Sequence, residues 1–218
     1  AFAVFCLLSS AVYLMNDLKD IEHDRQHPEK RHRPLAAGAL SPLVAVAMAV
    51  VLAAGSLGAA YALRPAFALV GLIYLLMQVA YTLLLKQVVL LDVFIIALGF
   101  VLRAVGGAVA IGAEISPWLY IVTLLGALFL GFAKRRHELL LLSEVAGQHR
   151  PILEEYSAPL LDQIITIMAA ATIMAYSLYT FTSPKLPRNH LMMLTIPLVL
   201  FGMCRYLYLI HRHEAGGK

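Results

Sequence analysis

Residues 1–24 read AFAVFCLLSSAVYLMNDLKDIEHD, so an uncharged apolar run passes directly into a cluster of acids. The apolar run is too short for a whole membrane span of about 20 residues, and we interpret it as the end of one. Asn16, Asp20 and Asp24 are four residues apart, so they share one face of a helix that continues through the motif. Mg²⁺ prefers such oxygen ligands and brings substrate phosphates with it. The stretch predicts a magnesium site at a helix end, and a solvated charged loop is the alternative.

The composition indicates a membrane protein. Hydrophobic residues make up 61% of the 218 residues and charged residues only 14%, and the mean hydropathy is +0.80. A soluble domain of this size does not need so much apolar surface, so the sequence predicts an all-α, polytopic transmembrane helical bundle. Cys6 and Cys204 lie in apolar segments, which favours small buried or lipid-facing residues over a disulfide or a metal site.

Seven apolar segments predict membrane-spanning helices, at 1–15, 43–62, 67–85, 92–112, 117–133, 161–181 and 191–210. The first begins within a hydrophobic run and without Met, so we expect one domain over 1–218 that lacks a span at each end. Long charged connections alternate with short, nearly neutral ones. One side of the membrane receives the loops 16–42, 86–91 and 134–160, the tail from 205, and every Lys and Arg except Arg64, Arg103, Lys185 and Arg188. The positive-inside rule assigns that side to the cytoplasm, so we expect a site that faces the cytoplasm from the inner membrane.

The sequence shows no strand pattern, glycine-rich phosphate loop or nucleotide fingerprint, and we expect no nucleic-acid partner. Glycines within the predicted spans are expected to permit close helix packing; they are Gly106, Gly107, Gly112, Gly126 and Gly131. The oligomeric state is not readable from the sequence.

A second charged cluster, Lys134 to Glu138, opens the loop 134–160. Its two end residues are four apart and share a helical face, as the acids of the first motif do. A topology anchor with an intrahelical ion pair is the alternative. A basic run from Lys30 to Arg33 also follows the first motif. We expect the acidic and basic clusters to hold a metal-bound diphosphate, with the metal on one wall and cations on the other.

Two charged residues belong to the predicted span 92–112. Arg103 lies near its middle, where an arginine is costly unless it faces a cavity or a partner. Asp92 opens the span, and we expect the two side chains to line one cavity. The alternatives are a helix N-cap for Asp92 and a purely structural ion pair for Arg103. Lys86 is either a ligand or an interfacial anchor.

These motifs resemble the UbiA superfamily of intramembrane transferases. The likeness rests on Asn16-Asp17-x-x-Asp20-x-x-x-Asp24 followed by Lys30-x-His32-Arg33-Pro34-Leu35-Ala36-x-Gly38, and on Lys86, Asp92, Gly99-Phe100 and Arg103-x-x-x-Gly107. It implies a UbiA-like bundle around a central cavity, with about seven of an expected nine spans present. It also implies Mg²⁺ as the cofactor and substrate-binding roles for Asn16, Lys30, Arg33, Lys86, Asp92, Arg103, Lys134, Arg135 and Glu138.

Most of the superfamily joins a prenyl diphosphate to an aromatic acceptor and carries a second acidic motif, Asp-x-x-x-Asp. Here Lys134 stands in the first acidic position. This departure resembles the branch of decaprenyl-phosphate phosphoribosyltransferases, where a Lys-Arg-x-x-Glu-Leu segment occupies this place. The resemblance implies transfer of 5-phosphoribose from phosphoribosyl diphosphate to a polyprenyl phosphate, for cell-wall arabinan precursors. Donor and acceptor both carry phosphates, which suits the additional cations.

The expected chemistry follows from these substrates. Mg²⁺ on Asn16, Asp20 and Asp24 would polarise the diphosphate as it leaves C1 of the ribose. The carboxylates of Asp17, Asp20 and Asp24 would stabilise the positive charge that develops at C1. The lipid phosphate is already an anion, so no general base is required. Lys134, Arg135 and Arg103 are candidates to bind phosphate groups.

Two other functions remain open from the sequence. A prenyltransferase could act on 4-hydroxybenzoate, a quinone precursor or a haem, although Lys134 argues against it. A transporter or lipid scaffold could place Arg103 and Asp92 on a permeation path. That function leaves the helical spacing of Asn16, Asp20 and Asp24 without a purpose.

Overall fold

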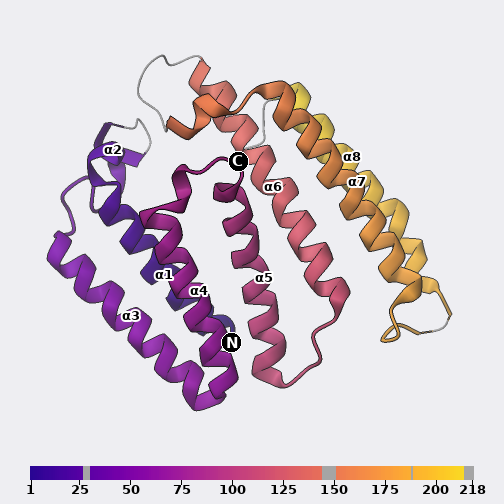
Figure 1. Cartoon of the computed structure of the whole chain (residues 1–218), viewed down its shortest axis with the longest axis horizontal. Helices are drawn as coiled ribbons and strands as arrows, with labels where there is room; N and C mark the ends of the chain where they lie inside the picture. Colours follow the sequence, from indigo (N-terminus) through magenta and orange to yellow (C-terminus); the bar gives the residue numbers. More distant parts are fainter. Residues whose placement is uncertain (27–29, 144–150, 188, 214–218) are drawn as a thin grey trace. The chain divides into compact units, whose positions relative to one another are not determined.

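The structure is a computed structural model, and it describes residues 1–26, 30–143, 151–187 and 189–213 (Figure 1). Its α-helices are α1 (Phe2–Lys19), α2 (Ile21–Gln26), α3 (Pro42–Leu63), α4 (Pro65–Leu83), α5 (Leu91–Ile111), α6 (Pro117–Ser143), α7 (Ala158–Thr182) and α8 (Ile196–His213). Short 3-10 turns lie at η1 (Lys30–His32), η2 (Leu85–Gln87), η3 (Pro151–Glu155) and η4 (Leu191–Thr195). The described residues contain no strand, so the all-α prediction is confirmed.

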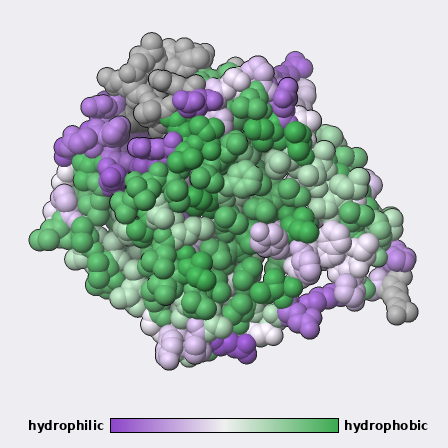
Figure 2. All heavy atoms as spheres, viewed as in Figure 1, coloured by the Kyte–Doolittle hydropathy of each residue, from purple (hydrophilic) through white to green (hydrophobic). Residues whose placement is uncertain are grey.

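Within the described residues, seven helical segments are long and apolar enough to cross a membrane. They lie at Phe2–Lys19, Pro42–Leu63, Pro65–Leu83, Leu91–Ile111, Pro117–Leu140, Ala158–Thr182 and Leu191–Arg212. Their order matches the seven predicted spans, and the last one opens with η4. Figure 2 shows that apolar side chains cover most of the visible surface, as expected where lipid replaces water. Both cysteines are exposed free thiols.

The chain divides into two compact units, and each is described by itself. The first unit comprises residues 1–88 and 102–115, and the second comprises residues 89–101 and 116–218. Helix α5 therefore gives its first half to the second unit and its second half to the first. One domain over residues 1–218 stays a prediction.

Aromatic rings fill the core of the first unit, where α1 packs against α3 and α4. The ring of Phe5 meets the rings of Phe67 and Tyr74 edge to face, with centroids 5.8 and 5.5 Å apart. Gly106 of α5 lies directly against this cluster, because a Cβ there would sit 2.5 Å from Phe5 Cε2. Close helix packing at Gly106 is therefore confirmed.

The core of the second unit lies between α6 and α7 and includes Phe129, Phe132, Leu161 and Ile165. Gly131 permits close approach here, since a Cβ would lie 2.6 Å from Val93 Cγ1.

The other three predicted packing glycines behave differently. An added Cβ at Gly107 or Gly126 would meet no described atom within 4 Å, so the close packing predicted there is wrong. Gly112 lies just past the end of α5 with a φ of +69°, a left-handed conformation that glycine adopts readily. Its neighbour is the guanidinium of Arg64.

Candidate functional site

The acidic motif spans the junction of α1 and α2. Helix α1 ends at Lys19, and Asp20 forms a turn before α2 begins. The backbone hydrogen bonds nevertheless continue through the junction, from Asp20 N to Asn16 O at 3.0 Å and from Asp24 N to Asp20 O at 2.8 Å. The predicted helical spacing of the three residues is therefore present.

Asp20 is held by a lysine that is distant in the sequence. Lys86 lies in η2, directly after α4, and its Nζ donates to Asp20 Oδ1 at 2.5 Å. Both side chains are largely shielded from solvent, at 13% exposure for Lys86 and 19% for Asp20. Lys86 is thus part of the acidic cluster, whereas a simple interfacial anchor would point away from it.

Arg33 joins the other two carboxylates of the motif. Its Nη1 donates to Asp17 Oδ1 at 2.7 Å and to Asp24 Oδ2 at 2.9 Å. Asp24 is buried, and a buried carboxylate needs such a partner. Lys30, at the start of η1, is half-buried in the same basic segment. The segment after α2 therefore folds back onto the acids, as the sequence spacing suggested.

The chemistry of this cluster fits a hard divalent cation that arrives with a phosphate ligand. Its side-chain donors are the amide of Asn16 and the carboxylates of Asp17, Asp20 and Asp24, which all offer oxygen. Among the described residues, no three His, Cys, Asp or Glu side chains are already grouped around one point. The carboxylates are instead divided between Lys86 and Arg33, and lysine and arginine are side-chain types that can also bind phosphate.

Arg103, the arginine within α5, is bound by hydroxyl groups of the first unit. Its Nη2 donates to Tyr74 Oη at 2.6 Å and to Ser9 Oγ at 3.0 Å. Its guanidinium carbon also lies 5.2 Å from the centre of the Tyr74 ring. These contacts lower the free-energy cost of placing the Arg103 guanidinium within a membrane-spanning helix.

Asp92, at the start of α5, belongs to a buried network in the second unit. Arg135 Nε donates to Asp92 Oδ2 at 2.6 Å, and Tyr156 Oη donates to Asp92 Oδ1 at 2.8 Å. The backbone N–H of Leu90 donates to Tyr156 Oη at 2.7 Å. The carboxylate of Asp92 thus faces a cation and a phenol, and the alternative of a helix N-cap is wrong because α5 already begins at Leu91.

The basic cluster on α6 places neighbouring residues in different environments. Lys134 is exposed and makes no ion pair with any other residue that the structure describes. Arg135 is 4% exposed, and its Nη1 also donates to Glu138. Glu138 therefore pairs with Arg135, and the intrahelical ion pair with Lys134, which was the alternative interpretation of this cluster, is not formed.

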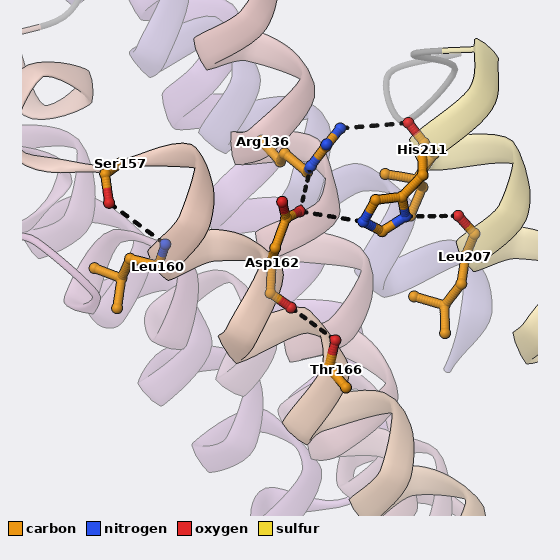
Figure 3. Close-up of polar contacts among 8 residues, drawn as sticks. Arg136, Ser157, Leu160, Asp162, Thr166, Leu207 and His211 are labelled. Atoms are coloured by element: carbon orange, nitrogen blue, oxygen red, sulfur yellow. Dashed lines mark hydrogen bonds and ion pairs between the residues drawn. The ribbon is translucent and has the colours of Figure 1, made fainter.

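A third polar cluster, which sequence reasoning missed, joins α6, α7 and α8 (Figure 3). Arg136 Nε donates to Asp162 Oδ1 at 2.5 Å, and its Nη1 donates to the carbonyl of Ile210 at 3.3 Å. His211 Nε2 lies 3.3 Å from the same Asp162 oxygen. The signal that could have found this cluster was an acid at the start of one predicted span and a cation at the end of another. Tyr156 was also missed, because a lone tyrosine in a loop carries no pattern.

The chain is similar to known proteins over most of its length. The family model described as the UbiA prenyltransferase family matches residues 1–216. A decaprenyl-phosphate phosphoribosyltransferase of Mycobacterium tuberculosis is 40% identical over 181 residues, which cover 83% of this chain and 60% of the relative. A protein of the same name from Corynebacterium glutamicum is 40% identical over 183 residues, covering 83% of this chain and 55% of the relative. The chain thus spans somewhat more than half the length of these relatives.

The fold is also found in a solved structure. A UbiA homolog from Archaeoglobus fulgidus bound to GPP and Mg²⁺ superposes with a TM-score of 0.80 at 19% identity. The match covers 95% of this chain and 73% of that one. At this identity, the likeness establishes a common fold.

Proposed function

Since the chain belongs to the UbiA prenyltransferase family, we propose that it is a phosphoribosyltransferase of that family. Its reaction moves 5-phosphoribose from phosphoribosyl diphosphate to a polyprenyl phosphate of the decaprenyl type, and the product supplies cell-wall arabinan precursors. The observation that carries this proposal is the exposed Lys134 of α6, at a position where the family's prenyl-transferring members have an acid. The similarity to two proteins named decaprenyl-phosphate phosphoribosyltransferase supports it.

The acidic cluster is proposed to bind the diphosphate of the donor. Asn16, Asp20 and Asp24 would hold Mg²⁺, which when bound neutralises the diphosphate as a leaving group. Lys86 and Arg33 then exchange their carboxylate partners for phosphate oxygens, since both cations already lie within the cluster. In this exchange Asp20 and Asp24 would pass from Lys86 and Arg33 to the metal, so the buried carboxylate of Asp24 would keep a cationic partner.

The bond changes need no proton transfer. The bond between C1 of the ribose and the diphosphate oxygen breaks, and its electrons leave with the diphosphate. An oxygen of the lipid phosphate forms the new bond to C1. Carboxylates of the motif, Asp17 among them, stabilise the positive charge that develops at C1. The lipid phosphate is anionic throughout, so no side chain must act as a base.

Lys134 is proposed to bind a phosphate group of a substrate. Its side chain is exposed and makes no ion pair with another described residue, so its charge is available. A lysine supplies a fixed positive charge where a carboxylate would call for a second metal ion. We therefore propose a single Mg²⁺.

Prenyl transfer is the second candidate function. It is favoured by the common fold with a UbiA homolog that is bound to GPP, a prenyl diphosphate, and Mg²⁺. The two functions differ in the donor, so the donor assay separates them.

The test uses membranes that contain the full protein. Samples are incubated with radiolabelled phosphoribosyl diphosphate or with radiolabelled prenyl diphosphate, with Mg²⁺ or with a chelator. We expect Mg²⁺-dependent label in a butanol-extractable lipid from the first donor alone. Transfer of label from the prenyl donor alone would contradict phosphoribosyl transfer and support prenyl transfer.

A further inference from the structure

Tyr156 connects the loop before α7 to the start of α5, within the second unit. Its hydroxyl oxygen accepts a hydrogen bond from the Leu90 N–H, and its hydroxyl proton is donated to Asp92. The hydroxyl is therefore held both as an acceptor and as a donor. Leu90 has a φ of +68°, a strained conformation for a residue other than glycine. The Tyr156 side chain is itself buried. A buried hydroxyl with two defined partners, beside a strained backbone, indicates a site that is held in one arrangement.

The network continues from Asp92 into α6. The side chain of Asp92 is 1% exposed and that of Arg135 is 5% exposed, so the ion pair between them is shielded from water. Successive residues of a helix point about 100° apart. Fixing Arg135 inward on Asp92 therefore fixes the direction in which the neighbouring Lys134 points, which is outward.

The protonation state of Tyr156 suits this role. Burial raises the pKa of the Tyr156 hydroxyl above its ordinary value, and the hydrogen bond and negative charge of Asp92 raise it further. The hydroxyl therefore keeps its proton across the physiological range. It remains a donor to Asp92.

We propose that Tyr156 is a positioning residue, which acts through Asp92 and Arg135 to hold Lys134 of α6 in one orientation. The inference rests on the proposed function, because Lys134 is there a phosphate ligand. The rings of Phe129 and Phe132 pack in the core of the same unit, which also contains the ring of Tyr156, and Tyr156→Phe keeps that ring. Loss of the Tyr156 hydroxyl alone should therefore loosen α6 around Arg135 and leave the unit folded.

The first test is the kinetics of Tyr156→Phe in the full protein. A positioning role predicts a KM for phosphoribosyl diphosphate raised about fivefold or more, with kcat changed less than about twofold. A merely structural role predicts less active protein, which lowers the apparent kcat at an unchanged KM. Tyr176→Phe is the control, because it removes a tyrosine hydroxyl of the same unit that is hydrogen-bonded elsewhere, to Thr195 on η4. An unchanged KM in Tyr156→Phe would overturn the inference.

The second test does not depend on the donor. A nitroxide label is attached to a Lys134→Cys variant in which Cys6→Ser and Cys204→Ser remove the native thiols. We expect its electron paramagnetic resonance spectrum to show greater mobility after Tyr156→Phe and no change after Tyr176→Phe. Equal mobility in all three proteins would reject the positioning role. If the parent transfers no phosphoribose, the proposed function fails and the mobility alone decides whether Tyr156 positions Lys134.

Discussion

Asp20 and Lys86 are 66 residues apart in the sequence, yet Lys86 Nζ lies 2.5 Å from Asp20 Oδ1. The pair connects the end of α1 to the turn after α4, within the first unit. It places a cation beside a carboxylate that we propose to bind Mg²⁺. Each carboxylate among Asp17, Asp20 and Asp24 therefore has a cationic partner before any substrate arrives, and a metal-bound diphosphate can replace these ion pairs.

The role of Asp20 as a metal ligand predicts that Asp20→Ala abolishes transfer while the protein still inserts and folds. Glu22→Ala is the control, because Glu22 is exposed and its ion pair is with Arg25 alone among the described contacts. Transfer rates of both variants at saturating Mg²⁺ decide the matter. Near-normal activity of Asp20→Ala would reject the metal role.

The spans and the helical spacing of the acids were predictable because both depend on local sequence. Apolar length sets the spans, and the interval of four sets the shared direction of Asn16, Asp20 and Asp24. The partners of the charged residues were not predictable in the same way. Lys134 and Arg135 are neighbours in the basic run, yet one is exposed and the other is buried on Asp92, 43 residues away.

Local periodicity contains no information about such distant partners. The same limit explains why Tyr156 was missed, since its value comes from Leu90 and Asp92. It also explains the error at Gly107, because a small residue on a helix packs closely only where a neighbour faces it.

Lys134 as a phosphate ligand predicts that Lys134→Ala slows transfer or weakens donor binding by at least about tenfold, or about 1.4 kcal/mol. Lys134→Asp should be worse, because a carboxylate repels the phosphates, unless it recruits a second metal. A Mg²⁺ titration of both variants with phosphoribosyl diphosphate distinguishes these effects. If Lys134→Ala matches the parent, the basic cluster is only a topology anchor.

Membrane topology follows from the distribution of Lys and Arg. The loops 16–42 and 134–160 should both face the cytoplasm, and 182–190 should face the opposite side. Single cysteines at Arg31, Glu155 and Lys185, in a background without native thiols, can be labelled in intact cells with an impermeant maleimide. Only Lys185→Cys should react. Reaction of Arg31→Cys but not of Glu155→Cys would place the two charged loops on opposite sides and exclude a common site.

Helix packing in the first unit can be tested at two adjacent glycines. Gly106→Ala should destabilise the protein by about 1–3 kcal/mol, because the new Cβ would press on the ring of Phe5, which Phe67 and Tyr74 enclose. Gly107→Ala should be neutral or slightly stabilising, since no described atom lies within 4 Å of its Cβ position. Denaturant unfolding in detergent micelles measures both. Equal stability of the two variants would contradict the packing described here.

The most direct measurement is the mass of the lipid product. Purified protein in Mg²⁺-containing buffer receives a polyprenyl phosphate and phosphoribosyl diphosphate with ¹³C throughout the ribose. We predict a lipid that gains one intact 5-phosphoribosyl group with all of its ¹³C, together with an equal amount of released diphosphate. Both should be lost in Asp20→Ala. An unaltered polyprenyl phosphate, in a preparation that instead transfers a prenyl group to an aromatic acceptor, would contradict phosphoribosyl transfer.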